Sequence, residues 1–105
     1  MDLMTFQALA EENRFHIVEY LRNGPHSVGE ISTSLKLEQP QTSKHLRILA
    51  DAGVVDVRPM KQKRIYALSP KKFEEMDEWI ASFRQVMEER FQRLDKLLAV
   101  EERKT

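Results

Sequence analysis

The chain has 105 residues, of which 41% are hydrophobic and 32% are charged, a balance typical of one small globular domain rather than of a disordered chain. It contains no cysteine, which excludes disulfides, thiolate metal sites and cysteine nucleophiles. Its formal net charge is zero, and it has no apolar run long enough for a signal peptide or a membrane span. We therefore expect a cytoplasmic protein without a membrane partner.

The first predicted elements are helices within residues 1–22. Apolar residues recur at helical spacing from Leu3 to Leu21, a pattern that predicts one interrupted helix or two short helices. The pair Gly24-Pro25 then ends the helical pattern, because glycine favours a helix C-terminus and proline cannot continue a helix.

A helix-turn-helix is predicted over residues 27–53. Ser27 and Glu30 have the spacing of a capping box, in which each side chain bonds the backbone N–H of the other residue. A short helix is therefore expected to begin there. A second helix is expected to begin near Gln39, with Pro40 in its first turn, where a missing N–H costs nothing.

Residues 54–69 are predicted to form a β-hairpin, since two short apolar strands flank a polar turn at residues 60–63. The pair Ser69-Pro70 then opens a long helix over residues 70–100, which neither glycine nor proline interrupts. The predicted order is thus N-terminal helices, a helix-turn-helix, a hairpin and a long last helix.

Positive charge is concentrated in the middle of the chain. Between Gln39 and Lys72 there are eight basic and two acidic residues, a net charge of +6, so the rest of the chain carries −6. A basic block inside a neutral protein is typical of contact with a polyanion, because phosphate contacts supply most non-specific affinity for nucleic acids. The common alternative is a solvated surface.

The second helix of the predicted helix-turn-helix has one apolar and one polar face. With Leu46 at the centre of the buried face, Thr42, Leu49 and Ala50 fall on the same side. The other face offers amides, hydroxyls and cations, which are the groups that contact base edges and phosphates in a major groove. Its predicted DNA contacts are Gln39, Pro40, Gln41, Ser43, Lys44, His45 and Arg47. For His45, packing or a phosphate contact is favoured over a role as a pH switch.

The predicted hairpin adds a second set of cations. Beside a recognition helix, a basic hairpin acts as a wing whose cations bind phosphates or enter the adjacent minor groove. The alternative is a hairpin end that charged side chains keep soluble and unpaired. The predicted wing contacts are Arg58, Lys61, Lys63 and Arg64. Together these features predict one winged helix-turn-helix domain over residues 1–105, mainly α with a small β-hairpin, and double-stranded DNA as partner.

The last predicted helix carries an apolar stripe. Apolar residues at heptad spacing run from Phe73 to Leu97, interrupted at Arg90, and further apolar residues widen the stripe. The stripe is wider than a single contact within the chain requires, which favours a second subunit as partner, so we expect a homodimer. The alternative is that both edges pack on the chain's own core. The predicted interface residues are Leu3, Phe6, Trp79, Phe83, Val86, Met87, Phe91 and Leu94.

Over nearly its whole length the sequence resembles the ArsR-type winged helix-turn-helix repressors. The resembling segments are Phe6–Ala10 with Arg14 and Ile17, Leu37–Leu46, Leu49–Val55 and Tyr66–Leu68. The resemblance implies a dimer built from the first and last helices and a wing from Val54 to Leu68. It also implies base and phosphate contacts by Gln39, Pro40, Ser43 and Lys44. Two departures are Gln62, where such wings often have glycine, and Glu38, which replaces the usual small hydroxyl cap.

The metal-sensing residues of many such repressors are missing here. The short helix from Glu30 to Leu35 lacks the family's cysteines, and the three histidines are scattered along the sequence. Where the last helix of the family has an Asp, two His and an acid, the nearest register has Asp77, Trp79, Arg90 and Arg93. We therefore expect no metal and no cofactor, and the effector remains unknown.

The sequence offers little for an enzyme, since it has no Gly-rich phosphate loop and no recognisable set of acid, base and nucleophile. The predicted function is sequence-specific DNA binding by a dimeric transcriptional repressor at an inverted-repeat operator. Alternatives are a winged helix used for protein contact, or a repressor that senses an organic ligand at the dimer interface near Trp79 and Phe83. The basic block favours DNA.

Overall fold

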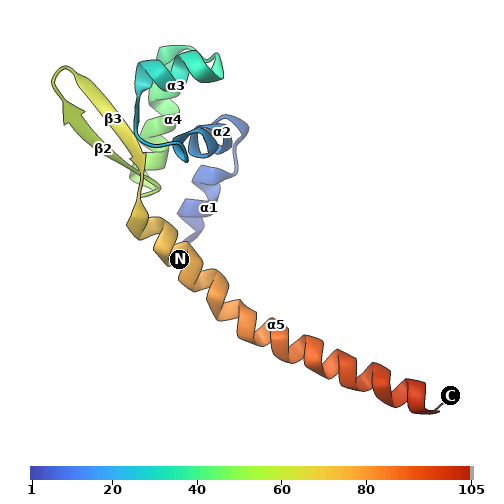
Figure 1. Cartoon of the computed structure of the whole chain (residues 1–105). Coiled ribbons are helices and arrows are strands. Elements are labelled where there is room, and N and C mark those ends of the chain that lie inside the picture. The colour runs from blue at the N-terminus through green and yellow to red at the C-terminus, as the bar shows by residue number, and fades with distance from the viewer. Residues whose placement is uncertain (105) are drawn as a thin grey trace. The chain divides into compact units, whose positions relative to one another are not determined.

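The computed structural model describes the backbone of residues 1–104 and the side chains of residues 1–101. It divides after Phe73 into two compact units. The first unit contains all the elements before α5 (Figure 1). The elements are α1 (Leu3–Leu9), α2 (Glu12–Leu21), β1 (His26–Ser27), α3 (Val28–Leu35), α4 (Gln39–Asp51), β2 (Val55–Met60), β3 (Lys63–Leu68) and α5 (Pro70–Lys104).

The architecture confirms the predicted fold class, which is mainly helical with a small antiparallel sheet. Of the two possibilities for the N-terminal segment, the structure has two short helices, with a break at Ala10 and Glu11. The last helix continues to Lys104, four residues beyond its predicted end. No described helix has the length and apolar character that a membrane span requires.

The sheet has one strand more than the sequence predicts. His26 lies outside every element that the sequence predicts, yet it forms the two-residue strand β1 with Ser27 and pairs with β3, opposite Tyr66. The strand order is β1-β3-β2. A two-residue strand is too short to show an alternating pattern, so only its pairing with β3 reveals it.

The turn between β2 and β3 is formed by Lys61 and Gln62, between the paired residues Met60 and Lys63. Lys61 adopts a φ of 58°, whereas Gln62 is not among the residues with positive φ. A positive φ at the first of two turn residues is typical of a type II′ hairpin turn. The absence of glycine at Gln62 therefore does not prevent a tight turn, because the residue before it takes the left-handed conformation.

The core of the first unit joins α2, α3 and α4 to the base of the sheet. Its fully buried side chains come from helices and from the residue just before β2 and are Ile17, Ile31, Leu46, Leu49 and Val54. In contrast, β2 is exposed from Asp56 to Met60. The core therefore holds the base of the hairpin, and the rest of β2 leaves it (Figure 1).

Local hydrogen bonds place the helix starts where the sequence predicts them. The Glu30 amide donates to Ser27 Oγ at 3.2 Å, and the Ser27 amide donates to Glu30 Oε1 at 3.3 Å, which confirms the capping box. A hydrogen bond from His26 and further bonds from Ser27 lower the pKa of Glu30. At the start of α4, Glu38 makes no side-chain cap, and the Thr42 amide and hydroxyl both donate to its carbonyl oxygen.

The C-terminus of α4 is a Schellman motif centred on Gly53, which has a φ of 76°. The Val54 amide donates to the Leu49 carbonyl at 2.9 Å, and the Gly53 amide donates to the Ala50 carbonyl at 3.0 Å. A Cβ at Gly53 would lie 3.3 Å from Lys72 Cε. This turn directs the chain from α4 into the wing.

We expect Gly53→Ala to lower the free energy of unfolding by about 1–2 kcal/mol, because a side chain is strained in the left-handed conformation. Urea denaturation followed by circular dichroism measures the change. Gly29→Ala is the matched control, since Gly29 lies inside α3, has no positive φ and leaves room for a methyl group. The control should be neutral or stabilising. Equal effects of both substitutions would contradict the role given to the backbone of Gly53.

Candidate nucleic-acid interface

Helix α4 turns its apolar side to the core and its polar side to solvent. Thr42, Leu46 and Leu49 are fully buried, as the helical pattern predicts. Six of the seven residues predicted to contact DNA are exposed, and they are Gln39, Pro40, Gln41, Ser43, Lys44 and Arg47. The seventh, His45, does not belong to this exposed face.

A groove of about 500 Å³ lies between α4 and the wing. Helix α4 contributes Ser43, Lys44 and Arg47 to it, and β3 contributes Arg64 and Tyr66. The remaining lining side chains are apolar and come from α3, α4 and β2. The tertiary structure thus brings three predicted DNA contacts of the helix and one of the wing around a single groove, which we call the α4–wing groove.

A second groove, with a volume of about 800 Å³, lies between α3 and the end of the wing. Its lining includes the hydroxyls of Thr33 and Ser34, the first residue of α4, Gln39, and the wing residues Lys63 and Arg64. Arg64 lines both grooves. The exposed N-terminal end of α4 therefore lies between α3 and a basic hairpin.

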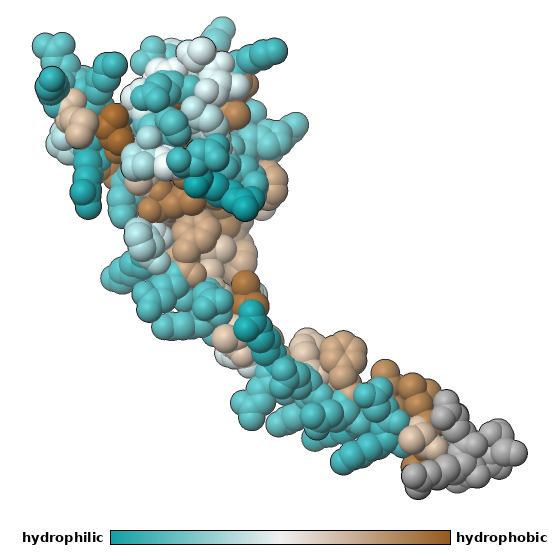
Figure 2. All heavy atoms as spheres, in the orientation of Figure 1, coloured by the Kyte–Doolittle hydropathy of each residue, from teal (hydrophilic) through white to brown (hydrophobic). Residues whose placement is uncertain are grey.

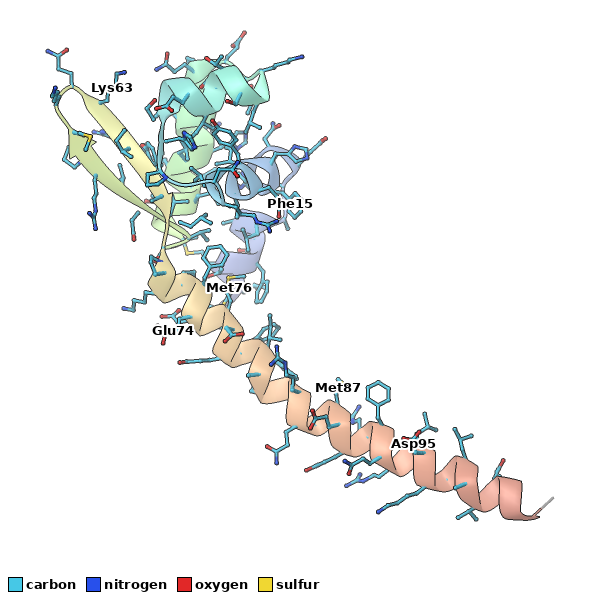
Figure 3. All side chains as sticks on the ribbon, in the orientation of Figure 1. Phe15, Lys63, Glu74, Met76, Met87 and Asp95 are labelled. Carbon is cyan, nitrogen blue, oxygen red and sulfur yellow. The ribbon has the colours of Figure 1, made fainter. Side chains whose placement is uncertain are left out.

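The positive charges at this surface are not neutralised by the chain itself. The hairpin cations are exposed, and Figure 3 shows Lys63 at the end of the wing. The one acidic residue of the hairpin, Asp56, pairs with Ala67 near its base. Within the described residues, no carboxylate forms an ion pair with any of the six predicted cationic contacts, which are Lys44, Arg47, Arg58, Lys61, Lys63 and Arg64.

His45 points from α4 toward the junction of α1 and α2. Its Nδ1 lies 3.4 Å from Arg14 Nη1 and 3.7 Å from Glu11 Oε2, and its side chain is only 13% exposed. The sequence placed His45 among the DNA contacts. The structure instead packs it against α2, because its position on the flank of α4 faces Arg14.

Arg14 makes the contacts that connect α1, α2 and α4 at this junction. Its Nε donates to the Ala8 carbonyl at 2.6 Å, and its Nη2 donates to the Gln7 carbonyl at 3.4 Å, so it binds the C-terminal end of α1. Glu11 caps α2 by accepting from the Arg14 amide at 2.9 Å, and this bond lowers the pKa of Glu11. We call Glu11, Arg14 and His45 the junction cluster.

Apolar side chains are exposed on both helices that the sequence assigns to a dimer interface. In α1, Leu3 is 71% exposed, and Phe6 is partly buried. In α5, exposed apolar side chains recur along the helix, and Figure 2 shows brown apolar groups beside teal polar groups along it. The exposed predicted residues of α5 are Trp79, Phe83, Val86, Met87, Phe91 and Leu94.

Some exposed apolar residues and groove residues were missed at the sequence level. Met4 is 52% exposed and had no place in the predicted stripe, whereas Ile80 and Leu97, at 49% and 65%, belong to the predicted heptad pattern but were left out of the interface residues. Tyr66 lines the α4–wing groove but was assigned only to a strand. No sequence signal pairs Arg14 with His45, because 31 residues separate them.

The α3 residues that stand where the resemblance implies cysteines do not fit a metal. Ser32 is buried, and its Oγ has no hydrogen-bond partner among the described residues. Ser34 Oγ donates to Tyr20 Oη at 3.0 Å. Over the part of the chain that the structure describes, no three His, Cys, Asp or Glu side chains form a group that could hold a metal ion.

Comparison with known proteins supports the family. The family model described as bacterial regulatory protein, arsR family, matches residues 11–57. The HTH-type transcriptional regulator Rv2034 of Mycobacterium tuberculosis is 43% identical over 65 residues, which are 62% of this chain and 61% of that protein. The transcriptional activator HlyU of Vibrio cholerae is 36% identical over 76 residues, 72% of this chain and 70% of that protein.

Solved structures give the same result. A crystal structure of an ArsR family transcriptional regulator has a TM-score of 0.72 at 27% identity and covers 81% of this chain and 93% of its own. The structure of HlyU from Vibrio cholerae has a TM-score of 0.65 at 33% identity, and the match covers 78% of this chain and 89% of the HlyU chain. Together with the winged helix-turn-helix of the first unit, these matches show that the chain belongs to the ArsR family of bacterial regulatory proteins, a family of transcriptional regulators rather than of enzymes.

Proposed function

We propose that the protein binds an operator in double-stranded DNA as a homodimer and represses transcription from the adjacent promoter. The α4–wing groove carries this proposal. Lys44, Arg47 and Arg64 surround it without an acidic partner in the described residues, beside the exposed hydroxyl of Ser43. Unpaired cations on a helix and on a neighbouring hairpin are suited to phosphates on either side of a major groove.

The two elements have different parts in this proposal. The exposed N-terminal half of α4, from Gln39 to Lys44, supplies amides, a hydroxyl and a cation for base edges, since the first residues of a recognition helix reach deepest into the groove. Pro40 lies beside them in the first turn. The wing cations, from Arg58 to Arg64, bind phosphates or the adjacent minor groove. The helix thus supplies specificity and the wing supplies affinity.

The exposed apolar residues of α1 and α5 support a second copy of the chain as partner. Monomeric soluble proteins rarely expose contiguous apolar patches of more than a few hundred Å², whereas α5 exposes apolar side chains along most of its 35 residues. A symmetric dimer carries two α4 helices. Its operator is then an inverted repeat with half-sites separated by about one helical turn or a multiple of it.

Relatives regulate transcription in both directions. HlyU of Vibrio cholerae is named an activator, and SdpR of Bacillus subtilis, 27% identical over 78 residues, is named a repressor. For this chain we propose repression, because a dimer seated across two major grooves blocks access to a promoter. A reporter gene under the chain's own upstream DNA should be more active when the protein is absent. Lower activity in its absence would show activation instead.

Binding of the purified protein to its own upstream DNA and to a scrambled duplex tests the proposal directly. We expect tighter binding to the upstream DNA and a linear fall of log affinity with log salt concentration. Parallel measurements with added zinc and with a chelator should give the same affinity, because no group of described residues fits a metal ion. Equal, weak binding to both duplexes would contradict an operator in this region and favour a protein partner.

A further inference from the structure

The junction cluster joins three helices at one point. Arg14 extends from α2 and binds two carbonyl oxygens at the end of α1 through Nε and Nη2. Its remaining terminal nitrogen, Nη1, lies 3.4 Å from His45 Nδ1 on α4. Because the guanidinium can only donate, this contact is a hydrogen bond in the tautomer whose Nδ1 carries no proton. Arg14 therefore connects the end of α1 with the flank of α4 through a single side chain.

The cluster is too well enclosed to be a surface ion pair. The side chains of Arg14 and His45 are only 15% and 13% exposed. Glu11, at 33%, is the other charged group at His45 and also caps α2. In such surroundings, removing one partner leaves the other without its hydrogen bond, which costs more than the loss of an exposed pair. The cluster therefore links α1 and α4 through enclosed polar contacts rather than through a solvent-exposed ion pair.

Both helices that the cluster joins also have a role in the proposed function. Helix α1 exposes Leu3 and Met4 on its surface and offers the Gln7 and Ala8 carbonyls to Arg14. In α4, His45 immediately follows Lys44, one of the proposed DNA contacts. A change in the angle between α1 and α4 would therefore displace the DNA-contacting face relative to the dimer surface.

We propose that Arg14 and His45 are positioning residues that hold α4 at a fixed orientation to α1, and thereby set the half-site spacing that the dimer accepts. This inference rests on the proposed function. It assigns His45 no contact with DNA, although the residue belongs to the recognition helix. The spacing is set because the distance between the two α4 helices of a symmetric dimer depends on how rigidly each is held to its own dimer surface.

Spin labels test the rigid connection without DNA. Because the chain has no cysteine, Gln7→Cys and Asp51→Cys label α1 and α4 selectively, at two exposed positions. Labelled chains are mixed with excess unlabelled chain, so that each dimer contains one labelled copy. The distance distribution between the labels, measured by double electron–electron resonance, should be narrow in the parent and broad in His45→Leu and Arg14→Lys.

Two further variants separate positioning from simple packing. His45→Asn should restore the narrow distribution, because its amide oxygen lies as many bonds from Cα as Nδ1 does and can accept from Arg14. His16→Leu is the matched control, since His16 lies exposed on α2, away from the cluster. It should leave the distribution unchanged. Identical distributions in every variant would overturn the proposal, and thermal unfolding of each variant shows whether it folds.

Operators with varied half-site spacing test the functional consequence. The probe is a duplex that the parent protein selects from a random pool, remade with base pairs added or removed between its half-sites. In His45→Leu, the preference for the best spacing should fall by about tenfold, a coupling of ordinary size, while affinity for a single half-site stays unchanged. An equal loss at every spacing and at the single half-site would make His45 a direct DNA contact and overturn the proposal.

The two experiments fail separately. If the parent selects no duplex and the distance distribution between the labels still broadens in His45→Leu, the proposed function is wrong. The positioning of α4 by the cluster then stands, but without a consequence for an operator. If duplexes are selected but spacing preference is the same in all variants, the proposed function stands and the inference is overturned.

Discussion

Lys44→Ala should weaken binding to the operator by about one to two orders of magnitude, the range that corresponds to the loss of a good base contact. Lys44 is exposed on α4 and lines the α4–wing groove. Affinity for scrambled DNA should change much less, because other cations of the basic surface remain. Fluorescence anisotropy with operator and scrambled duplexes, each over a salt series, measures both effects.

A wing variant provides the comparison. Lys63→Ala should lower affinity for both duplexes by a similar factor and reduce the salt slope by about 1, as expected for one lost phosphate contact. Arg22→Ala is the control, since Arg22 is an exposed cation at the end of α2 that lines neither groove. If Lys44→Ala and Lys63→Ala reduced specificity equally, the division between a recognition helix and a wing that binds phosphates would be wrong.

Phe83→Glu should convert the dimer into monomers and lower operator affinity by about 100-fold or more, because the two half-site contacts are then no longer linked. Phe83 lies in the middle of the apolar stripe of α5, 45% exposed and in edge contact with Trp79. A buried, unpaired carboxylate at a subunit interface is strongly unfavourable. Sedimentation velocity over a concentration series gives the oligomeric state.

The matched control for the interface is Gln85→Glu. It introduces the same charge into the same helix, but Gln85 lies about 200° around the helix from Phe83 and is exposed. This variant should remain dimeric and bind the operator as the parent does. A dimeric Phe83→Glu protein would place the interface elsewhere on the chain and remove the argument from the exposed stripe of α5.

Local sequence patterns predicted the elements well, because their causes are local. The capping box of Ser27 and Glu30 involves residues three apart, and the structure has both of its hydrogen bonds. The buried face of α4 follows from helical periodicity, and Thr42, Leu46 and Leu49 are fully buried as predicted. The end of α4 near Gly53 follows from the freedom of glycine to adopt a positive φ.

Local patterns failed where a residue's role depends on a distant partner. Strand β1 exists only because β3 offers a free edge to His26 and Ser27, which lie far from it in the sequence. The turn conformation at Lys61 depends on the register of β2 and β3. Helical periodicity gives the face of α4 on which His45 lies. It does not show that the Arg14 guanidinium lies opposite that face.

The sequence by itself determined the order of the elements, the polar face of α4 and the apolar stripe of α5, since capping, periodicity and turn chemistry act over a few residues. Only the tertiary structure decided which side chains meet. Arg64 of the wing lines the same groove as Lys44 and Arg47 of α4. His45 lies in the junction cluster, against Arg14 and Glu11, and not on that surface. The physical reason is that packing of the common core fixes the relative orientation of helices and hairpin, and this orientation is a property of contacts between residues far apart in the chain.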